Sequence, residues 1–471
     1  MKKEIVNLFS LAKSDSLRLC YTKELPVTKH PLVKLMDCLE SFESGSRPEG
    51  GIVYLEDKDC ALSLGGEQIG IDGDVDLSRM PMVPLHFYEN TDKGKVLTGD
   101  ILLCKDGALT GKSCFVTDVF PVKEVMVNEH VYIFRGNGRL NQKILFHLIR
   151  SQFVQLQIKD LAYRKKGQPG LNTDHLTKIV LPDLNPNLQD ELLKLIESLE
   201  YSIDQLKSTE CSKYEVINKV FSTKFNLNTE EQLSIESGKK LNVNISNIGI
   251  NNDNLRISFR WNKMQNIQRN LYKNIDCIDL LGNYIINTNN GWSPESIEGG
   301  EGIPVLGQEH FSFEGRLNID PTKSTIETKK NIESFFIRQG DFFVSRGNTV
   351  DLVALASIVE SEVMEDIIYP DLYIKVELNE KLINKKYLAL VFNSFIGRLY
   401  FKYVSKGKNQ TMVKISSSEL SNFLLPIPQY DIQTEIVDSI EKQINALREI
   451  EKKIEDKKKE LSQLIENVIL N

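Results

Sequence analysis

The sequence has few cysteines, and they stand apart from one another. Seven cysteines occur among 471 residues with no CxxC pair, and the six histidines show no HxxxH or HExxH spacing. This pattern argues against a disulfide framework or a zinc site, and it is typical of reduced thiols in a cytoplasmic protein. We therefore expect no metal site in this chain.

Long apolar runs are also missing. No segment approaches 18 uninterrupted apolar residues, so we expect no membrane span, and the start MKKEIVNLFSLAKSDS has too short an apolar run for a signal peptide. The 41% apolar and 26% charged residues are the balance of a soluble globular protein, and the length suggests two or more domains. The net charge of −7 counts against DNA binding unless basic residues are clustered or a partner supplies more of them.

The motifs of the obvious nucleic-acid enzymes are absent. No Pro-Pro dipeptide occurs, so the chain lacks the [D/N]PP[Y/F] motif that grips a flipped adenine. GALTGKS (107–113) is one residue short of a P-loop and continues as a strand, which favours a turn with an exposed lysine. FRGNGRL (134–140) also has the composition of a turn. We expect no catalytic residue and no cofactor-binding residue.

What the chain does contain is a repeat of itself. Leu181-Pro182 matches Leu425-Pro426 at an offset of 244, and at the same offset Asn187 falls on Asp431 and Gln189 on Gln433. Asn and Asp are preferred helix N-caps, so we expect the same helix start in both copies. Other matches follow in the same order with small drifts: Leu17-Arg18 with Leu255-Arg256, Gly66-Glu67-Gln68 with Gly307-Gln308-Glu309, Gly99-Asp100 with Gly340-Asp341, and Tyr132 with Tyr373. Loop insertions produce such drifts.

Each copy is predicted to be a globular unit followed by a long helix. Short β-rich runs alternate with Gly and Asn turns, and one helix is expected over 141–158 and again over 384–402. The predicted class is α+β, mainly sheet with packed helices. The expected boundaries are a first globular unit at 1–184, a long helix at 185–225, a polar connector at 226–253, a second unit at 254–428 and a second long helix at 429–471.

The two long helices carry heptad patterns of apolar residues with charged flanks. Roughly 39 helical residues extend about 58 Å, which is longer than one small domain, so each helix needs a long partner. We expect the two to pair antiparallel as a coiled coil about a pseudo-two-fold axis, with Glu210 facing Lys457 in mid-seam. The predicted seam residues are Leu192, Ile196, Leu199, Ile203 and Leu206 in the first helix and Ile440, Leu447, Ile454 and Leu461 in the second.

This plan resembles the specificity subunit of type I restriction–modification systems over almost the whole chain. The most specific segments are GQPGLNTDHLTKIVLPDLNPNLQDEL and GKNQTMVKISSSELSNFLLPIPQYDIQTEI, in which a Gly/Gln loop precedes an apolar strand, a Pro-containing turn and a helix start with Gln. The family commonly has a Glu–Gln pair there; Leu188 and Ile432 replace the Glu.

The resemblance implies two target-recognition domains that read the halves of a bipartite double-stranded DNA target, with the helices as a spacer. It also implies that two methyltransferase subunits dock on the chain and methylate adenine, that restriction subunits can join them, and that S-adenosylmethionine is bound by the methyltransferase partner. The specificity subunit of this family has no catalysis of its own.

Equivalent basic loops are the candidate DNA contacts. Lys and Arg bind phosphates, Gly allows close backbone approach, and Gln or Asn can pair with adenine. A solvated turn explains one such loop equally well, but the recurrence in both copies favours DNA. The candidates are Lys105, Lys112, Arg164, Lys165, Lys166 and Gln168 in the first copy and Arg346, Lys406, Lys408, Asn409 and Gln410 in the second.

A protein-interaction scaffold remains open as the second hypothesis. Two similar domains held by a coiled coil could bind proteins and never DNA. A fragment of a fused restriction–methylation enzyme is a third possibility, but the missing catalytic motifs argue against it.

Overall fold

The computed structural model describes residues 26–51, 59–118, 120–163, 168–227, 237, 259–409 and 412–470. The chain is a mixed α+β protein that divides into two compact units. Unit 1 comprises Met1–Ser208 and Lys452–Asn471, and unit 2 comprises Thr209–Glu451. The predicted match of Leu17-Arg18 with Leu255-Arg256 and nearly all of the connector lie outside the described residues.

Unit 1 is built on a four-stranded antiparallel sheet. Its order is β2-β8-β5-β6, which are Leu39–Ser44, Val131–Gly136, Ile101–Cys104 and Ser113–Phe115. Alternate residues of β5 face opposite layers, as in any strand: Ile101 and Leu103 join the core beneath the helices, and Leu102 and Cys104 join a second core. That second core is formed with a sheet of order β4-β3-β7, which are Met82–Pro84, Cys60–Leu64 and Val125–Val127.

Unit 2 repeats this frame. Its main sheet is β11-β18-β15-β17, which are Ile285–Asn290, Tyr373–Leu378, Phe342–Ser345 and Ala356–Ile358. As in unit 1, one face of the central strand belongs to the helical core (Phe342 and Val344) and the other face to a separate core (Phe343). A three-stranded sheet of order β12-β14-β13 lies beyond it, formed by Ile297–Glu298, Lys323–Thr325 and Ile303–Val305.

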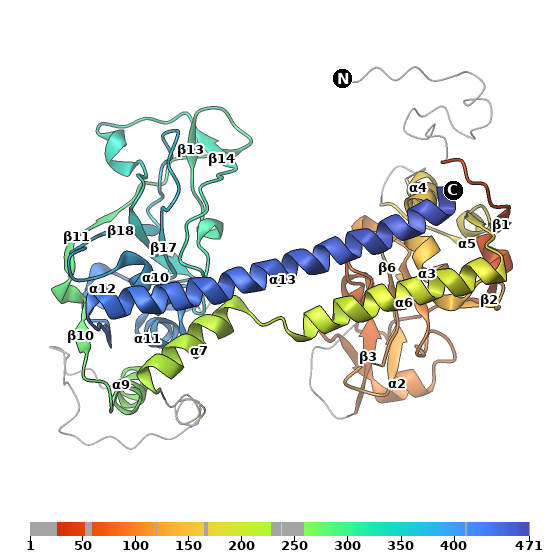
Figure 1. Cartoon of the computed structure of the whole chain (residues 1–471), viewed down its shortest axis with the longest axis horizontal. Coiled ribbons are helices and arrows are strands. Elements are labelled where there is room, and N and C mark those ends of the chain that lie inside the picture. Colours follow the sequence, from red (N-terminus) through yellow and green to blue (C-terminus); the bar gives the residue numbers. More distant parts are fainter. Residues whose placement is uncertain are drawn as a thin grey trace. The chain divides into compact units, whose positions relative to one another are not determined.

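The correspondence continues through the shorter elements at offsets of about 244 (Figure 1). Each unit has a small antiparallel pair in which the strand before the long helix meets the strand that opens the unit: β9 with β1 (Val180–Pro182, Leu32–Lys34) and β21 with β10 (Leu424–Pro426, Ile278–Leu280). One-turn helices precede β9 and β21: α5 (Thr173–Leu176) and α12 (Ser417–Ser421).

The single helix predicted in each copy is in fact two helices joined at a serine. In unit 1 these are α3 (Gln142–Arg150) and α4 (Gln152–Ala162), and in unit 2 α10 (Lys385–Asn393) and α11 (Phe395–Val404). Ser151 Oγ donates to the carbonyl of Leu148 and accepts from the amide of Val154. A serine hydroxyl that competes with the helical hydrogen bonds ends one helix and caps the next, which periodicity alone does not reveal.

Side-chain bonds are repeated as well. Gly99 and Gly340 both have positive φ, 89° and 85°. The aspartate that follows each glycine accepts a backbone hydrogen bond from three residues earlier, Leu97 to Asp100 at 2.8 Å and Arg338 to Asp341 at 2.8 Å. The predicted match of these Gly-Asp pairs therefore has the same local structure in both units.

The glutamine at the start of each long helix makes the same three hydrogen bonds. Gln189 is buried, donates to the carbonyls of Leu184 and Arg139, and accepts from the amide of Asn141, the N-cap of α3. Gln433 likewise donates to the carbonyls of Pro428 and Leu382 and accepts from the amide of Asn384, the N-cap of α10. These glutamines tie the long helix to the helical layer, so their recurrence has a structural cause.

The N-cap of the first long helix lies two residues earlier than predicted. α6 (Pro186–Ser208) begins after Asn185, whose side chain accepts from the amide of Leu188 at 3.0 Å. Asn187 therefore lies in the first turn and is not the cap. Pro186 stands at the first helical position, where its missing N–H is not needed. Asp431 is likewise inside α13 (Tyr430–Leu470).

The first long helix is not continuous. α6 ends at Ser208 and α7 (Lys213–Phe225) starts after Ser212, which caps it in a capping box with Glu215. Glu210 lies in the break and not on a helix, so it is no seam position, and Lys457 pairs with Glu460 of its own helix at 2.7 Å. The prediction of a single helix over 185–225 is wrong here because a Ser-x-x-Glu start signal interrupts the heptads.

In unit 1, α6 packs antiparallel against the last part of α13. Leu192 and Ile196 share a core with Ile465 and Ile469. Further along α6, Ile203 lines a cavity together with Leu461. Among the predicted seam residues, Leu192, Ile196, Ile203 and Ile454 are buried, while Leu199, Leu206 and Leu461 are half-buried.

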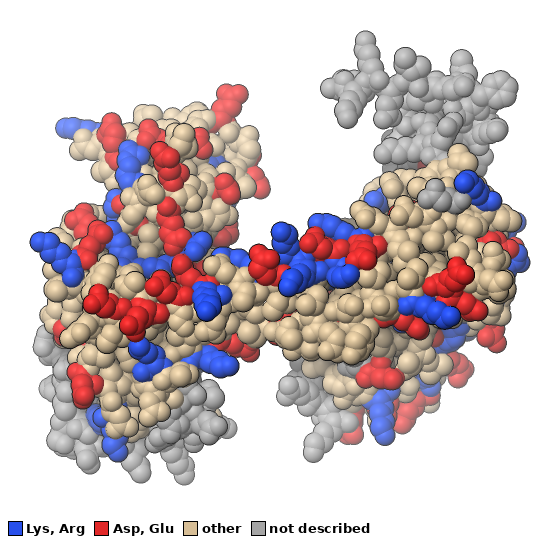
Figure 2. All heavy atoms as spheres, in the orientation of Figure 1, with Lys and Arg blue, Asp and Glu red and all other residues tan. Residues whose placement is uncertain are grey.

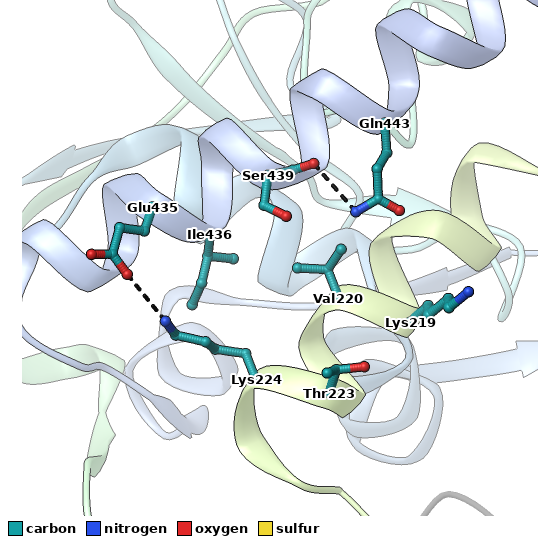
Figure 3. Close-up of a pocket in the computed structure, with 8 residues that line it drawn as sticks. All are labelled: Lys219, Val220, Thr223, Lys224, Glu435, Ile436, Ser439 and Gln443. Carbon is teal, nitrogen blue, oxygen red and sulfur yellow. Dashed lines mark hydrogen bonds and ion pairs between the residues drawn. The ribbon is translucent and has the colours of Figure 1, made fainter.

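In unit 2, α7 packs antiparallel against the first part of α13 (Figure 3). Val220 and Ile436 point into the space between the helices, and Lys224 forms an ion pair with Glu435 at 3.1 Å. The predicted seam residues Ile440 and Leu447 are buried in this core. α13 itself is one unbroken helix whose residues belong to both units.

One further sequence match is adjusted by the structure. The one-turn helices η3 (Gly66–Gln68) and η7 (Gln308–His310) follow Gly65 and Gly307, so the match of Gly66 with Gly307 is off by one residue.

In the described part of the chain, no helix is both long and apolar enough to cross a membrane.

Candidate nucleic-acid interface

The same backbone junction in both units holds the candidate basic residues. Lys105 follows β5 and Arg346 follows β15. The amide of Leu171 donates to the carbonyl of Lys105 at 2.6 Å, and the amide of Ile415 donates to the carbonyl of Arg346 at 2.9 Å. In the sequence, the two predicted basic loops precede Leu171 and Ile415, and in unit 1 the described part of that segment starts at Gln168.

A second backbone bond holds each cationic residue from the other side. The amide of Lys105 donates to the carbonyl of His130 at 2.9 Å, and that of Arg346 donates to the carbonyl of Leu372 at 2.7 Å. His130 and Leu372 precede the equivalent strands β8 and β18. A residue whose N–H and C=O are both bonded has its main chain fixed, which preorganises a contact that its side chain makes.

In unit 1 the Lys105 ammonium is positioned by an aromatic ring. Its Nζ lies 5.1 Å from the centroid of Tyr132, a cation–π distance. The Tyr132 hydroxyl donates to the carbonyl of Leu171 at 3.3 Å. Burial, with a smaller effect of the Asp106 carboxylate, raises the pKa of this hydroxyl, so it remains a donor at neutral pH.

Two carboxylates beside Lys105 have partners. His130 Nδ1 lies 2.8 Å from Asp106, and His130 Nε2 lies 3.2 Å from Glu129. Arg47 also pairs with Glu129 at 3.2 Å. The Arg47 pair reduces the repulsion that the Glu129 carboxylate would exert on a phosphate.

Lys112 and Gln168 lie near this junction on turns. The segment 107–113 forms the one-turn helix η4 (Gly107–Leu109) and then enters β6, with positive φ at Gly107 and Gly111. It is therefore a turn and not a phosphate-binding loop before a helix, as expected. Lys112 is half-buried and Gln168 exposed. Arg164, Lys165 and Lys166 lie outside the described residues.

In unit 2 the basic loop is a hairpin added to a short strand. β20 (Met412–Lys414) is the central strand between β16 (Gly347–Asn348) and β19 (Lys406–Asn409). Lys406 is exposed and forms an ion pair with Glu419 at 2.6 Å. Lys408 and Asn409 belong to β19, but their side chains, like all of Gln410, lie outside the described residues.

Arg346 is partly engaged within its own unit. Its Nη1 lies 3.4 Å from the carbonyl oxygen of Asp371 and 3.9 Å from the carboxylate, and the side chain is half-buried. These are long contacts, so a phosphate could compete for the guanidinium.

The structure adds one basic residue that the sequence analysis missed, Lys414. It stands directly opposite Lys406 in the hairpin and is exposed. The signal was present in the alternation of MVKI, because Met412 and Lys414 are exposed while Val413 and Ile415 are buried.

Charges of both signs are interspersed over the visible surface (Figure 2). Within the ranges that the structure describes, no group of three His, Cys, Asp or Glu side chains is arranged to hold a metal ion. The candidate site thus consists of a fixed cationic strand end in each unit and, in unit 2, the exposed lysines Lys406 and Lys414 of the adjoining hairpin.

Comparison with known proteins gives matches among solved structures only. No family model matches the chain, and no curated protein does. Three solved structures similar to the chain over almost its full length belong to type I restriction–modification systems. One, from work on complex assembly and conformational transition of the type I R-M system, is 14% identical, covers 95% of this chain and 98% of its own, and has a TM-score of 0.46.

The other two are S subunits. The type I restriction–modification S subunit from M. genitalium is 13% identical over 94% of this chain and 97% of its own, with a TM-score of 0.44. The HsdS subunit from Thermoanaerobacter tengcongensis is 14% identical over 95% and 98%, with a TM-score of 0.34. Because these TM-scores are below 0.5, the functional argument rests on the chain's own duplicated site.

Proposed function

We propose that this chain is the DNA-sequence-specificity subunit of a type I restriction–modification complex. Unit 1 and unit 2 each contain a target-recognition domain that reads one half of a bipartite duplex target. The chain performs no catalysis. It docks two adenine methyltransferase subunits, which carry S-adenosylmethionine, and restriction subunits can join them.

One observation carries this proposal: the same cationic junction is built twice. The Leu171–Lys105 and Ile415–Arg346 backbone bonds attach equivalent segments, each preceded in the sequence by a basic run, to a basic strand end. Cations at equivalent positions on equivalent folds suit a ligand that presents similar phosphates to both units, and duplex DNA does so. Sequence selection then falls to the parts in which the copies differ.

The long helices suit the role of a spacer. α6 and α7 each pack antiparallel on a part of α13 within their own unit, and α13 is continuous across 41 residues. We propose that these helices form the coiled-coil spacer that sets the separation between half-sites. A separation defined by helices is fixed in length, as a bipartite target requires.

The acidic balance of the chain predicts that the partner contributes to DNA binding. With a net charge of −7, the free chain should bind duplex DNA weakly, and the affinity should rise when the methyltransferase is added. Tight sequence-specific binding by the chain alone would contradict this.

The direct test removes the basic loop of unit 1. We expect Arg164→Ala, Lys165→Ala and Lys166→Ala together to weaken duplex binding by the methyltransferase complex more than about tenfold, and to lower the salt slope by up to about 3. The matched control is Lys29, Lys34 and Lys123 to alanine, three exposed lysines of the same unit. Equal affinities for the two triple variants would instead support a scaffold that binds only proteins.

A further inference from the structure

The hairpin of unit 2 places two lysines directly opposite each other. Lys406 of β19 and Lys414 of β20 are cross-strand partners, and directly opposed residues project from the same face of a sheet. Both are exposed. Like charges in this arrangement weaken a hairpin unless an anion lies between or above them.

Two glycines shape the backbone beneath this face. Gly347 stands opposite Lys414 on the other neighbouring strand, and a Cβ there would lie 3.4 Å from Cγ and 3.7 Å from Cε of Lys414. The aliphatic stem of Lys414 therefore extends over a position without a side chain. Gly407 lies where the register shifts, and a Cβ there would come within 2.5 Å of the Met412 carbonyl oxygen.

The two lysines differ in their partners. Lys406 is paired with Glu419 at 2.6 Å, and this bond lowers the pKa of Glu419 against the opposing effect of burial. Lys414 makes no ion pair with any residue that the structure describes. One lysine is thus held in place by a carboxylate, while the other is available to an external anion.

Among the residues of unit 1 that the structure describes, no lysine pair corresponds to this one. At the offset of 244 that relates β9 to β21, Gly170 takes the place of Lys414, and Gly170 forms an isolated bridge with Asp106. Within the described ranges, the paired cations therefore occur in unit 2 and not at the matching position of unit 1.

We propose that Lys414, with Lys406 beside it, binds a phosphate of the DNA backbone in unit 2. The proposal rests on the proposed function and adds a specific phosphate contact to it. The hairpin supplies the geometry, the Lys414 stem packs over Gly347, and Glu419 holds Lys406 until a phosphate competes for it.

The test uses the full chain in complex with an adenine methyltransferase subunit that it binds, and a random-sequence duplex as probe. Affinity is measured over a series of salt concentrations. We expect Lys414→Gln to weaken binding about three- to tenfold and to lower the salt slope by about 1, because one phosphate contact is lost. Lys381→Gln, at another exposed lysine of unit 2, is the control for the charge change and should leave both values unchanged.

A second variant should act in the opposite direction. Glu419→Gln keeps a side chain that can complete the capping box with Ser416 but removes the charge that holds Lys406. We expect it to strengthen duplex binding about twofold, an effect that a merely structural lysine pair would not produce. Combining it with Lys414→Gln separates the contributions of the two lysines.

The possible failures are distinguishable. If the wild-type complex binds no duplex, the proposed function is wrong and this inference falls with it. If the wild type binds but Lys414→Gln matches Lys381→Gln in affinity and slope, only the lysine site is wrong. Each variant should unfold at the same temperature as the wild type. A loss of DNA affinity then reflects the lost contact and not a loss of folding.

Discussion

Equivalent places in the two units are filled in opposite ways. In unit 1, the space between α3, β6, α6 and α13 is a cavity of about 740 Å³ lined by Lys143, His147 and Glu200. In unit 2 the corresponding space, beside Lys386 and Leu390, measures only about 10 Å³. The frame of strands and helices is therefore shared, while its filling is specific to each copy.

The ion pairs show the same contrast. In unit 1, Glu200 of α6 pairs with Lys143 at 2.7 Å and with His147 at 3.1 Å across the edge of the cavity. In unit 2, Glu314 pairs with Lys213 at 2.8 Å and also contacts Arg448. In unit 2 a carboxylate of the long helix also joins the layer to the globular part, because Glu441 of α13 pairs with Arg316 at 3.0 Å. Unit 2 therefore adds Glu314 to an arrangement that both units share.

The largest expected effect comes from the feature that the units share most closely. Gln189→Ala should destabilise unit 1 by about 2–3 kcal/mol, because it leaves the amide of Asn141 and two carbonyls without a partner in a buried place. Gln433→Ala should do the same to unit 2. Urea unfolding followed by hydrogen exchange in each unit measures both.

The control for this pair is Gln463→Ala, an exposed glutamine on α13. It should change stability by less than about 0.5 kcal/mol. A loss confined to one of Gln189 and Gln433 would show that the two clamps are not equivalent.

Acid should act on unit 2 through Glu314. Burial alone would raise its pKa, but the Lys213 bond and the Arg448 charge outweigh it and leave the pKa below 4.5. A carboxyl with a lowered folded pKa stabilises above its unfolded value, and that stability is lost as the pH falls below about 4.5.

We expect Glu314→Gln to cost about 1–3 kcal/mol at pH 7 and to lose this part of the acid dependence. Unfolding free energies at pH 7 and pH 3.5, for wild type and variant, provide the measurement. The two proteins should differ less at the lower pH, and a constant difference would contradict the assignment.

The smallest effect is a difference between matched substitutions. Ile203 lines the cavity of unit 1, and at the 244 offset Leu447 lies in the packed core of unit 2. Leu447→Phe should cost about 1–3 kcal/mol through overpacking, whereas Ile203→Phe has room and should cost less than about 1 kcal/mol. Equal costs from thermal unfolding would mean that the cavity closes in solution.

Much of the frame could be predicted because it depends on local signals. The Gly-Asp pairs, the strand ends at Leu181-Pro182 and Leu425-Pro426, and the match of Gln189 with Gln433 all follow from short motifs repeated at a nearly constant offset. The break at Ser151 was missed because a single hydroxyl ends a helix without disturbing the apolar period. The break before Ser212 was missed because the start signal formed by Ser212 and Glu215 was overlooked.

The candidate site was predictable only in part. Lys105 and Arg346 could be matched by offset, but their contacts with Leu171 and Ile415 depend on a loop returning to a strand end, which no local pattern encodes. Lys414 was missed because its importance comes from the cross-strand register with Lys406. Register is set by the turn, and the turn geometry was not evident in the sequence.

The central claim is that two equivalent units read two halves of one DNA target. The most direct test is to map adenine methylation in cells that have or lack this chain together with its methyltransferase. The account predicts one split motif, with two specified parts and a fixed unspecified spacer, that disappears without the chain. A methylation pattern that does not depend on the chain, or a single uninterrupted motif, would contradict it.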